Sequence, residues 1–189
     1  MEQDKRRCAR LIERKQKLIA ERETWEEHWQ DVADYVLPRK ADIEKTRAKG
    51  DKRTELIFDA TAIHALELLS ASLHGMLTNS ATAWFALAYK DNYLDTDDIS
   101  KEWLESAQEA MYVAFSRSNF QQEIHEFYYD LASFGTACMF VESDPENIMR
   151  FSTRYVKEFC VSENAKGIVD TVYREIKMTA RQCIERFGK

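Results

Sequence analysis

The sequence predicts an α+β fold: a long N-terminal helix and a helical bundle, followed by antiparallel hairpins and a short C-terminal helix. Three observations predict it. The 189 residues include only two prolines and five glycines, so the chain has few positions at which a helix must end. Apolar residues recur at helical spacing through most of residues 1–135. Residues 136–189 instead form short apolar runs separated by turn residues. We expect the mainly helical residues 1–135 and the hairpin-forming residues 136–189 to build one continuous domain.

The first element is a long amphipathic helix from about residue 5 to Leu37, ended by Pro38. Lys15 and Arg22 occupy part of its apolar seam, so we expect the first half to pack loosely or against a partner and to project from the body. Residues 25–36 are expected to pack on the core. The residues that recur at every seventh position are Leu11, Leu18, Trp25 and Val32.

A basic segment follows, from Pro38 to Arg53. The net charge of the chain is -6, which disfavours a tight phosphate binder. The segment therefore fits either a solvated loop between helices or a weak, salt-sensitive contact with DNA. A loop this polar is expected not to pack, so reversing the charges of Lys45, Arg47 and Lys49 should leave the fold intact. The candidate DNA-contact residues are Arg39, Lys40, Lys45, Arg47, Lys49, Lys52 and Arg53.

Small and apolar residues dominate the next segment, from Leu56 to Leu77. A helix of this composition is expected to be buried on most faces. The short apolar run Trp84–Tyr89 that follows predicts a strand covering this helix. Aromatic residues in such a strand more often anchor a core than stack on nucleic-acid bases, so Trp84 and Phe85 are interpreted as structural.

Two further helices have capping signals. The acidic run 95–98 predicts the start of one helix, and Asn119 with Gln122 predicts a capping box for the next, which Gly135 should end. The missing oxygen ligands of a calcium loop argue against a metal at the acidic run. The expected core face of the first helix is Ile99, Trp103, Ala107, Ala110, Met111 and Ala114. That of the second is Phe120, Ile124, Phe127, Tyr128, Leu131 and Phe134.

The remaining residues predict two antiparallel hairpins and a final helix. The first hairpin pairs residues 136–142 with 148–153, and the second pairs 155–162 with 168–178, each around a turn rich in Asp, Asn, Pro or Gly. Thr179 and Gln182 form a capping box that opens the last helix.

Motifs of catalysis and cofactor binding are absent from the sequence. It contains neither a glycine-rich phosphate loop nor a Gly-x-Ser-x-Gly turn, and His125-Glu126 lacks the second histidine of a zinc helix. His64 and His74 are interpreted as buried hydrogen-bonded residues or as interface residues. We therefore predict no enzyme activity, no catalytic residue, no cofactor, no metal and no membrane span. The scattered cysteines, predicted to be separate reduced thiols, are Cys8, Cys138, Cys160 and Cys183.

The order of these features resembles the head-to-tail connecting (portal) proteins of short-tailed bacteriophages. The resemblance covers nearly the whole chain. One departure is residues 79–83, which contain no proline where family members usually have one. The resemblance depends on Trp25, Trp29, Tyr35 and Pro38, on Asp59-Ala-Thr-Ala62, on Leu73-His-Gly-Met-Leu-Thr78 before Trp84-Phe85, on Tyr128 to Val141, on Gly167-Ile-Val-Asp170, and on Thr179-Ala-Arg-Gln182 with Phe187-Gly188.

By this resemblance, the chain would be the N-terminal, wing-like portion of a longer portal protein. The intact protein would form a dodecameric ring at one capsid vertex, for DNA packaging, DNA ejection and tail attachment. Its partners would be the packaging terminase, capsid and tail proteins, with DNA passing through and weakly bound. The protein would belong to the virion and be made in the bacterial cytoplasm. The alternative from the residues alone is a helical interaction or scaffold module unrelated to phage.

Overall fold

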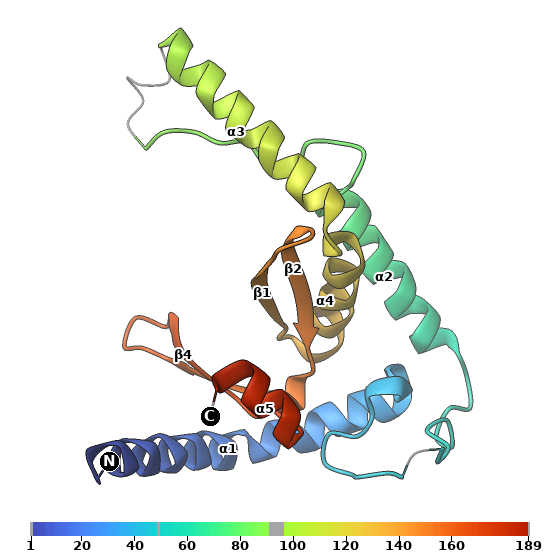
Figure 1. Ribbon diagram of the computed structural model, residues 1–189. Helices are drawn as coiled ribbons and strands as arrows, with labels where there is room; N and C mark the ends of the chain where they lie inside the picture. Colours follow the sequence, from blue (N-terminus) through green and yellow to red (C-terminus); the bar gives the residue numbers. More distant parts are fainter. Residues whose placement is uncertain (1, 49, 91–96, 189) are drawn as a thin grey trace.

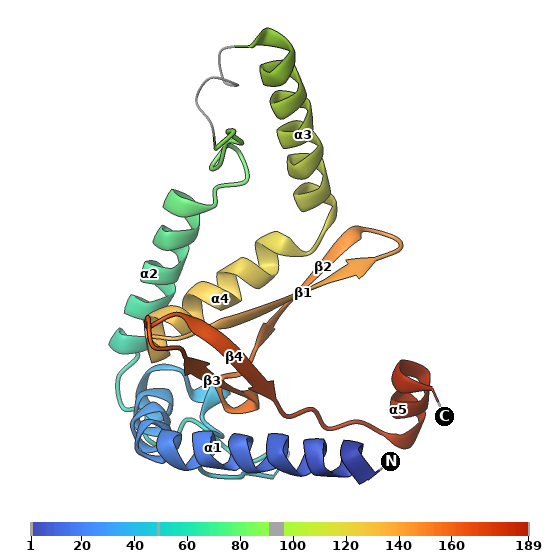
Figure 2. The ribbon, with the colours of Figure 1, turned by 90° about the vertical axis from the view of Figure 1, so that its left-hand side faces the viewer.

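The computed structural model describes residues 2–48, 50–90 and 97–188, and it confirms the α+β class. In these ranges, five α-helices are accompanied by two separate two-stranded antiparallel sheets. Helix α1 lies along one end of the molecule, α3 extends from the other, and the hairpins lie between them against α4 and α1 (Figures 1 and 2).

Helix α1 (Glu2–Val36) is the predicted long helix, and a 3₁₀ turn, η1 (Pro38–Lys40), follows it. Its second half packs on the core as expected, through Trp29 and Ala33, although Trp25 is exposed. Its first half is exposed from residue 3 to residue 14 and projects from the body (Figure 1).

Helix α2 (Thr61–Leu77) is much less buried than its composition predicts. It begins only at Thr61, because the Asp59 carboxylate accepts hydrogen bonds from the backbone N–H (3.1 Å) and hydroxyl (2.7 Å) of that threonine. Within this fully described helix, Leu66 and Ser70 are the buried residues. The expectation of burial on most faces is wrong because α4 covers one side of α2, while the opposite side is open.

The run 84–89 is described throughout but contains no strand, so this prediction is wrong. The Tyr112 hydroxyl replaces a neighbouring strand: it accepts the backbone N–H groups of Trp84 (2.7 Å) and Phe85 (2.8 Å) and donates to the Phe85 carbonyl (2.9 Å). The Trp84 ring stacks on Phe120, with centroids 5.7 Å apart. Trp84 therefore joins the core beside α3 and α4, where Leu73 of α2 also packs.

Helix α3 (Asp98–Arg117) has the predicted N-terminal cap, since Asp97 accepts the N–H of Ser100 at 3.0 Å. Asp95 and Thr96 lie outside the described residues. The predicted core face is wrong along most of the helix, because Ile99, Trp103, Ala110 and Met111 are exposed; of the predicted residues, Ala107 is half-buried and Ala114 is buried. The helix contacts the body through its other side and its last turns, and Ala114 is buried there.

Helix α4 (Phe120–Phe134) has the predicted end and most of the predicted face, although Leu131 is exposed and Phe127 is half-buried. Gly135 terminates it in the left-handed region (φ 70°), which other residues rarely adopt. The capping box is wrong, because the Asn119 amide instead donates to the Phe151 carbonyl and accepts its N–H, both at 2.9 Å. Asn119 therefore ties α4 to β2. The buried apolar residues of α4 are Phe120, Ile124, Tyr128 and Phe134.

Both predicted hairpins are present, with shifted limits. Strands β1 (Cys138–Asp144) and β2 (Ile148–Arg154) form one, and β3 (Phe159–Glu163) and β4 (Val169–Arg174) form the other. Residues 156–158, predicted as strand, form the 3₁₀ turn η3 instead.

The last helix, α5 (Ala180–Phe187), begins with the predicted capping box. The Thr179 hydroxyl accepts the Gln182 N–H, and the Gln182 side chain accepts the Thr179 N–H in return. The four cysteines are free, as predicted.

Candidate functional site

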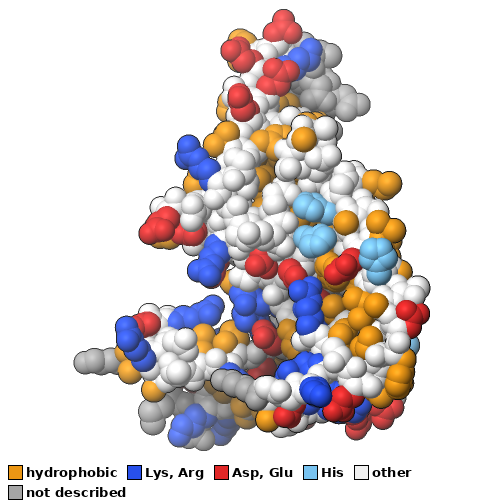
Figure 3. All heavy atoms as spheres, turned by 90° about the vertical axis from the view of Figure 1, so that its right-hand side faces the viewer, with side chains coloured by type: hydrophobic (Ala, Val, Ile, Leu, Met, Phe, Trp, Pro, Cys, Tyr) orange, Lys and Arg blue, Asp and Glu red, His pale blue; other side chains and the backbone are white. Residues whose placement is uncertain are grey.

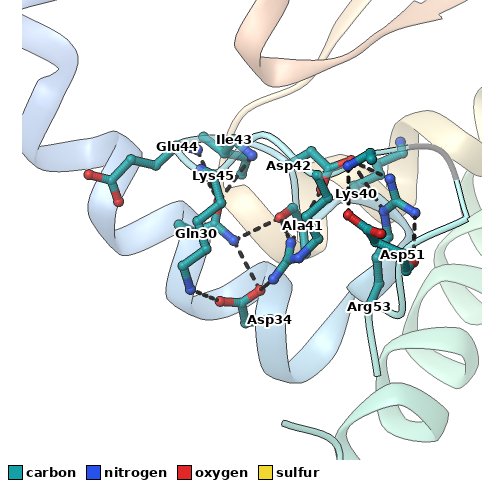
Figure 4. Close-up of polar contacts among 12 residues, drawn as sticks. Gln30, Asp34, Lys40, Ala41, Asp42, Ile43, Glu44, Lys45, Asp51 and Arg53 are labelled. Atoms are coloured by element: carbon teal, nitrogen blue, oxygen red, sulfur yellow. Dashed lines mark hydrogen bonds and ion pairs between the residues drawn. The ribbon is translucent and has the colours of Figure 1, made fainter. Parts of the chain in front are cut away.

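The first part of the basic segment, up to Ile43, is packed, which contradicts the expectation of an unpacked loop. Ala41 and Ile43 are at most 1% exposed. The buried Gln30 amide of α1 holds them: its Nε2 donates to the Ala41 carbonyl at 2.8 Å, and its Oε1 accepts the N–H groups of Ile43 (3.0 Å) and Glu44 (2.9 Å) (Figure 4). A side chain thus provides the hydrogen bonds that a loop this close to the core needs.

Asp34, one turn after Gln30, is the centre of the segment's charge network. Its carboxylate is 3% exposed and accepts Lys45 Nζ at 2.7 Å, Arg47 Nη2 at 3.0 Å and Gln30 Nε2 at 3.0 Å (Figure 4). Burial alone would raise the pKa of Asp34, but the hydrogen bonds from Lys45 and Arg47 outweigh it and hold the pKa below its ordinary value. Lys45 and Arg47 therefore neutralise a buried carboxylate of their own chain.

A second carboxylate, Asp42, links two arginines of the same segment. It accepts Arg53 Nη2 at 2.7 Å and Arg47 Nη1 at 3.2 Å. The hydrogen bond from Arg53 lowers the pKa of Asp42 despite partial burial. Arg47 thus bridges Asp34 and Asp42.

The first two cations of the segment pair with α4. Arg39 Nη2 donates to both oxygens of the Glu126 carboxylate (2.9 and 3.0 Å), and Lys40 pairs with Asp130, which is almost fully buried. Burial raises the pKa of Asp130, and Lys40 opposes that shift. These pairs join the basic segment to α4.

Five of the seven candidate DNA-contact residues are therefore paired with acids of the same chain: Arg39, Lys40, Lys45, Arg47 and Arg53. Lys52 is exposed and makes no hydrogen bond or ion pair with the described residues, while Lys49 lies outside them. The structure thus gives most of these cations a structural role, and contact with DNA stays a prediction. Sequence reasoning missed Gln30 and Asp34, although two polar residues beside Trp29 and Ala33 on the core half of α1 are a usable signal.

The histidines have structural surroundings or lie at the surface. His74 is half-buried and its ring hydrogen bonds to the Gln121 side chain (2.6 Å), which fits the interpretation as a hydrogen-bonded residue. His64 is exposed. Within the ranges described, no group of three or more His, Cys, Asp or Glu residues is arranged to hold a metal ion. Nor is any described helix long and apolar enough to cross a membrane.

Large apolar side chains are exposed on the open sides of α2 and α3. On α2, Leu68, Met76 and Leu77 are more than half exposed; on α3, Ile99 and Trp103 are. Figure 3 shows hydrophobic side chains at several places on the surface seen from the α2 side, and acidic side chains gathered at the outer end of α3. Exposed apolar surface of this kind is typical of proteins that bind other proteins.

Comparison with known proteins identifies the family. A sequence profile described as "Bacteriophage head to tail connecting protein" matches residues 9–189. The "Probable portal protein" of Bordetella phage BPP-1 is 33% identical over 180 residues, which are 95% of this chain and 32% of that protein. The "Portal protein" of Salmonella phage epsilon15 is 32% identical over 180 residues, with the same shares of both chains. The chain spans about a third of the length of these relatives. It belongs to the family of bacteriophage head-to-tail connecting proteins.

Proposed function

We propose that this chain is the wing-like portion of a portal, a ring at one capsid vertex that serves DNA packaging, DNA ejection and tail attachment. The observation that supports this most is 33% identity to a probable portal protein over 95% of the chain. A phage-unrelated scaffold module is not favoured, because the family match extends over residues 9–189. The role is structural, and no catalysis is proposed.

The proposed partners follow from the same role. The intact protein would form a dodecamer and contact the packaging terminase, capsid and tail proteins, within a virion whose proteins are made in the bacterial cytoplasm. A closed ring needs two different contact surfaces on each subunit, and the exposed apolar residues of α3 can belong to one of them. The net charge of -6 would repel DNA phosphates, which suits a passage that must not hold its cargo.

We also propose that residues 1–135 and 136–189 act as one unit. Arg22 on α1 donates to the backbone carbonyls of Val156 and Phe159, and the Asn119 side chain makes two hydrogen bonds, both of 2.9 Å, with the Phe151 backbone. The bonds from Arg22 fix the start of the second hairpin to the long helix.

The test is to locate the chain in purified virions with a gold-labelled antibody raised against it. The proposal expects label at a single vertex of each particle, where the tail joins the head. An antibody against the major capsid protein is the control and should label the whole shell. Label spread over the shell, or absent from virions, would overturn the proposal.

Weak binding of DNA through the basic segment is retained as a proposal, but the structure changes its test. Reversing Lys45 and Arg47 would leave Asp34 unpaired, so it would no longer report on DNA alone. Lys52→Glu is the better variant, with Lys166→Glu as a control at another exposed lysine. We expect Lys52→Glu to weaken duplex binding and to reduce the salt slope of log affinity by about 0.9. An unchanged slope would contradict a contact at Lys52.

A further inference from the structure

The outer parts of two projecting helices carry opposite charges. The exposed part of α1 has five basic and two acidic residues between positions 3 and 14. The outer half of α3 has four acidic residues and one basic residue between positions 98 and 109. In Figure 1 these two segments lie at opposite ends of the molecule, so one copy cannot bring its own pair together without refolding.

The basic side of α1 is an ordered stripe. Arg7, Arg10 and Arg14 follow the spacing i, i+3, i+7, which places them on one face of a helix. All three are exposed, and none forms a hydrogen bond or ion pair with a residue in the described ranges. Leu11, one turn after Arg7, is 47% exposed beside them. We call these three arginines and Leu11 the basic face.

The acidic side of α3 has the same order. Glu102, Glu105 and Glu109 repeat the spacing i, i+3, i+7, are exposed, and pair with nothing that the structure describes. Two large apolar residues, Ile99 (77% exposed) and Trp103 (61%), lie next to this stripe. We call these three glutamates with Ile99 and Trp103 the acidic face.

The two faces match in length as well as in charge. Seven residues of helix advance about 10.5 Å, so the three arginines and the three glutamates span the same distance. Two helices laid side by side could therefore form three ion pairs at once and bring Leu11 against apolar surface of α3. Three weak exposed pairs acting together, with apolar burial, give a contact that is specific and salt-sensitive.

We propose that the basic face of one copy docks on the acidic face of a second copy. Each chain carries each face once, so the contact is head-to-tail and can repeat around a closed ring. A polyanion such as DNA would satisfy the arginines alone and be repelled by the acidic face, whereas a second copy satisfies both. This inference depends on the proposed ring function and names the surfaces that join neighbouring subunits.

Charge reversal provides the test in the 189-residue chain. The basic-face variant carries Arg7→Glu, Arg10→Glu and Arg14→Glu; the acidic-face variant carries Glu102→Arg, Glu105→Arg and Glu109→Arg. The control variant reverses three other exposed acids, with Glu23→Arg, Glu27→Arg and Asp31→Arg, and changes net charge as much as the acidic-face variant does. Self-association is measured by sedimentation velocity at high protein concentration, at about 0.1 M and about 1 M salt, where the Debye length falls from roughly 10 Å to roughly 3 Å.

We expect each face variant alone to self-associate at least about tenfold more weakly than wild type at the lower salt, and the control variant to be unchanged. Mixing the two face variants should restore association, because every junction between unlike copies again pairs opposite charges. Unchanged association in either variant would overturn the inference, as would a mixture that does not recover. The antibody experiment does not depend on these residues. A negative docking test would therefore not contradict the portal role, and a negative localisation would not contradict the measured association between copies.

Discussion

Replacing Asp34 by Asn should destabilise the chain far more than the same change at Asp31. Asp34 is 3% exposed and accepts hydrogen bonds from two cations of the basic segment and from Gln30, whereas Asp31 is exposed on the same helix. Asparagine keeps the shape of the side chain and one acceptor but loses the charge. Lys45 would then lose its charged partner, Arg47 would keep only Asp42, and the segment would lose its two ion pairs to α1.

The magnitude follows from the number of bonds. A hydrogen bond to a charged group contributes about 1.5–3 kcal/mol to stability. Two such bonds are weakened here, but the Lys45 side chain is 52% exposed, so its contribution must be discounted for solvent screening. We therefore expect a loss of about 2–3 kcal/mol for Asp34→Asn. Asp31→Asn should change the free energy of unfolding by less than about 0.5 kcal/mol.

The assay is urea unfolding followed by tryptophan fluorescence, repeated from neutral pH down to acid. The pKa of Asp34 is lowered in the folded state, so its contribution is fully present above the unfolded pKa of about 3.9 and is lost as the pH falls through the folded value. The gap between wild type and Asp34→Asn should therefore shrink only below about pH 4. Equal stability of the two asparagine variants at neutral pH would refute this account of the basic segment. So would a stability difference between wild type and Asp34→Asn that does not shrink at acid pH.

Further outcomes are expected from single substitutions, each checked by the same unfolding assay. Trp84→Ala should cost about 3 kcal/mol because the indole packs on Phe120, whereas Trp103→Ala should cost less than about 1 kcal/mol; equal losses would contradict the assigned burial. Gly135→Ala should destabilise by about 1 kcal/mol because its φ is 70°, and a neutral result would argue against the left-handed helix end. Asn119→Ala should cost about 2 kcal/mol by breaking both hydrogen bonds to Phe151; a loss typical of a surface cap would show that these bonds contribute little.

The elements that the sequence predicted well are those with a signal inside the element itself. The heptad pattern and Pro38 define α1, Gly135 ends α4, and Thr179 with Gln182 opens α5. Caps, helix ends and turns depend on residues a few positions apart, so a single sequence contains the whole interaction. The family resemblance likewise depended on the order of such local features.

The predictions that were wrong concern residues whose partners come from distant segments of the chain. Composition predicts a buried α2, but burial depends on how many neighbours cover it, and α4 covers one side. Residues 84–89 have the pattern of a strand, but the Tyr112 hydroxyl takes the backbone N–H groups at its start.

The candidate site divides in the same way. The sequence by itself determined the basic charge of the segment Pro38 to Arg53 and its position after α1. It also determined the matched spacing of the arginines on α1 and the glutamates on α3, which form the two proposed docking faces. Only the tertiary structure decided which charges are satisfied: Asp34 and Asp130 neutralise Lys45 and Lys40, while Arg10 and Glu105 stay exposed and unpaired among the described residues. The reason is physical, since a charge interacts with its partner through space, and folding alone sets which opposite charge lies within a few ångströms.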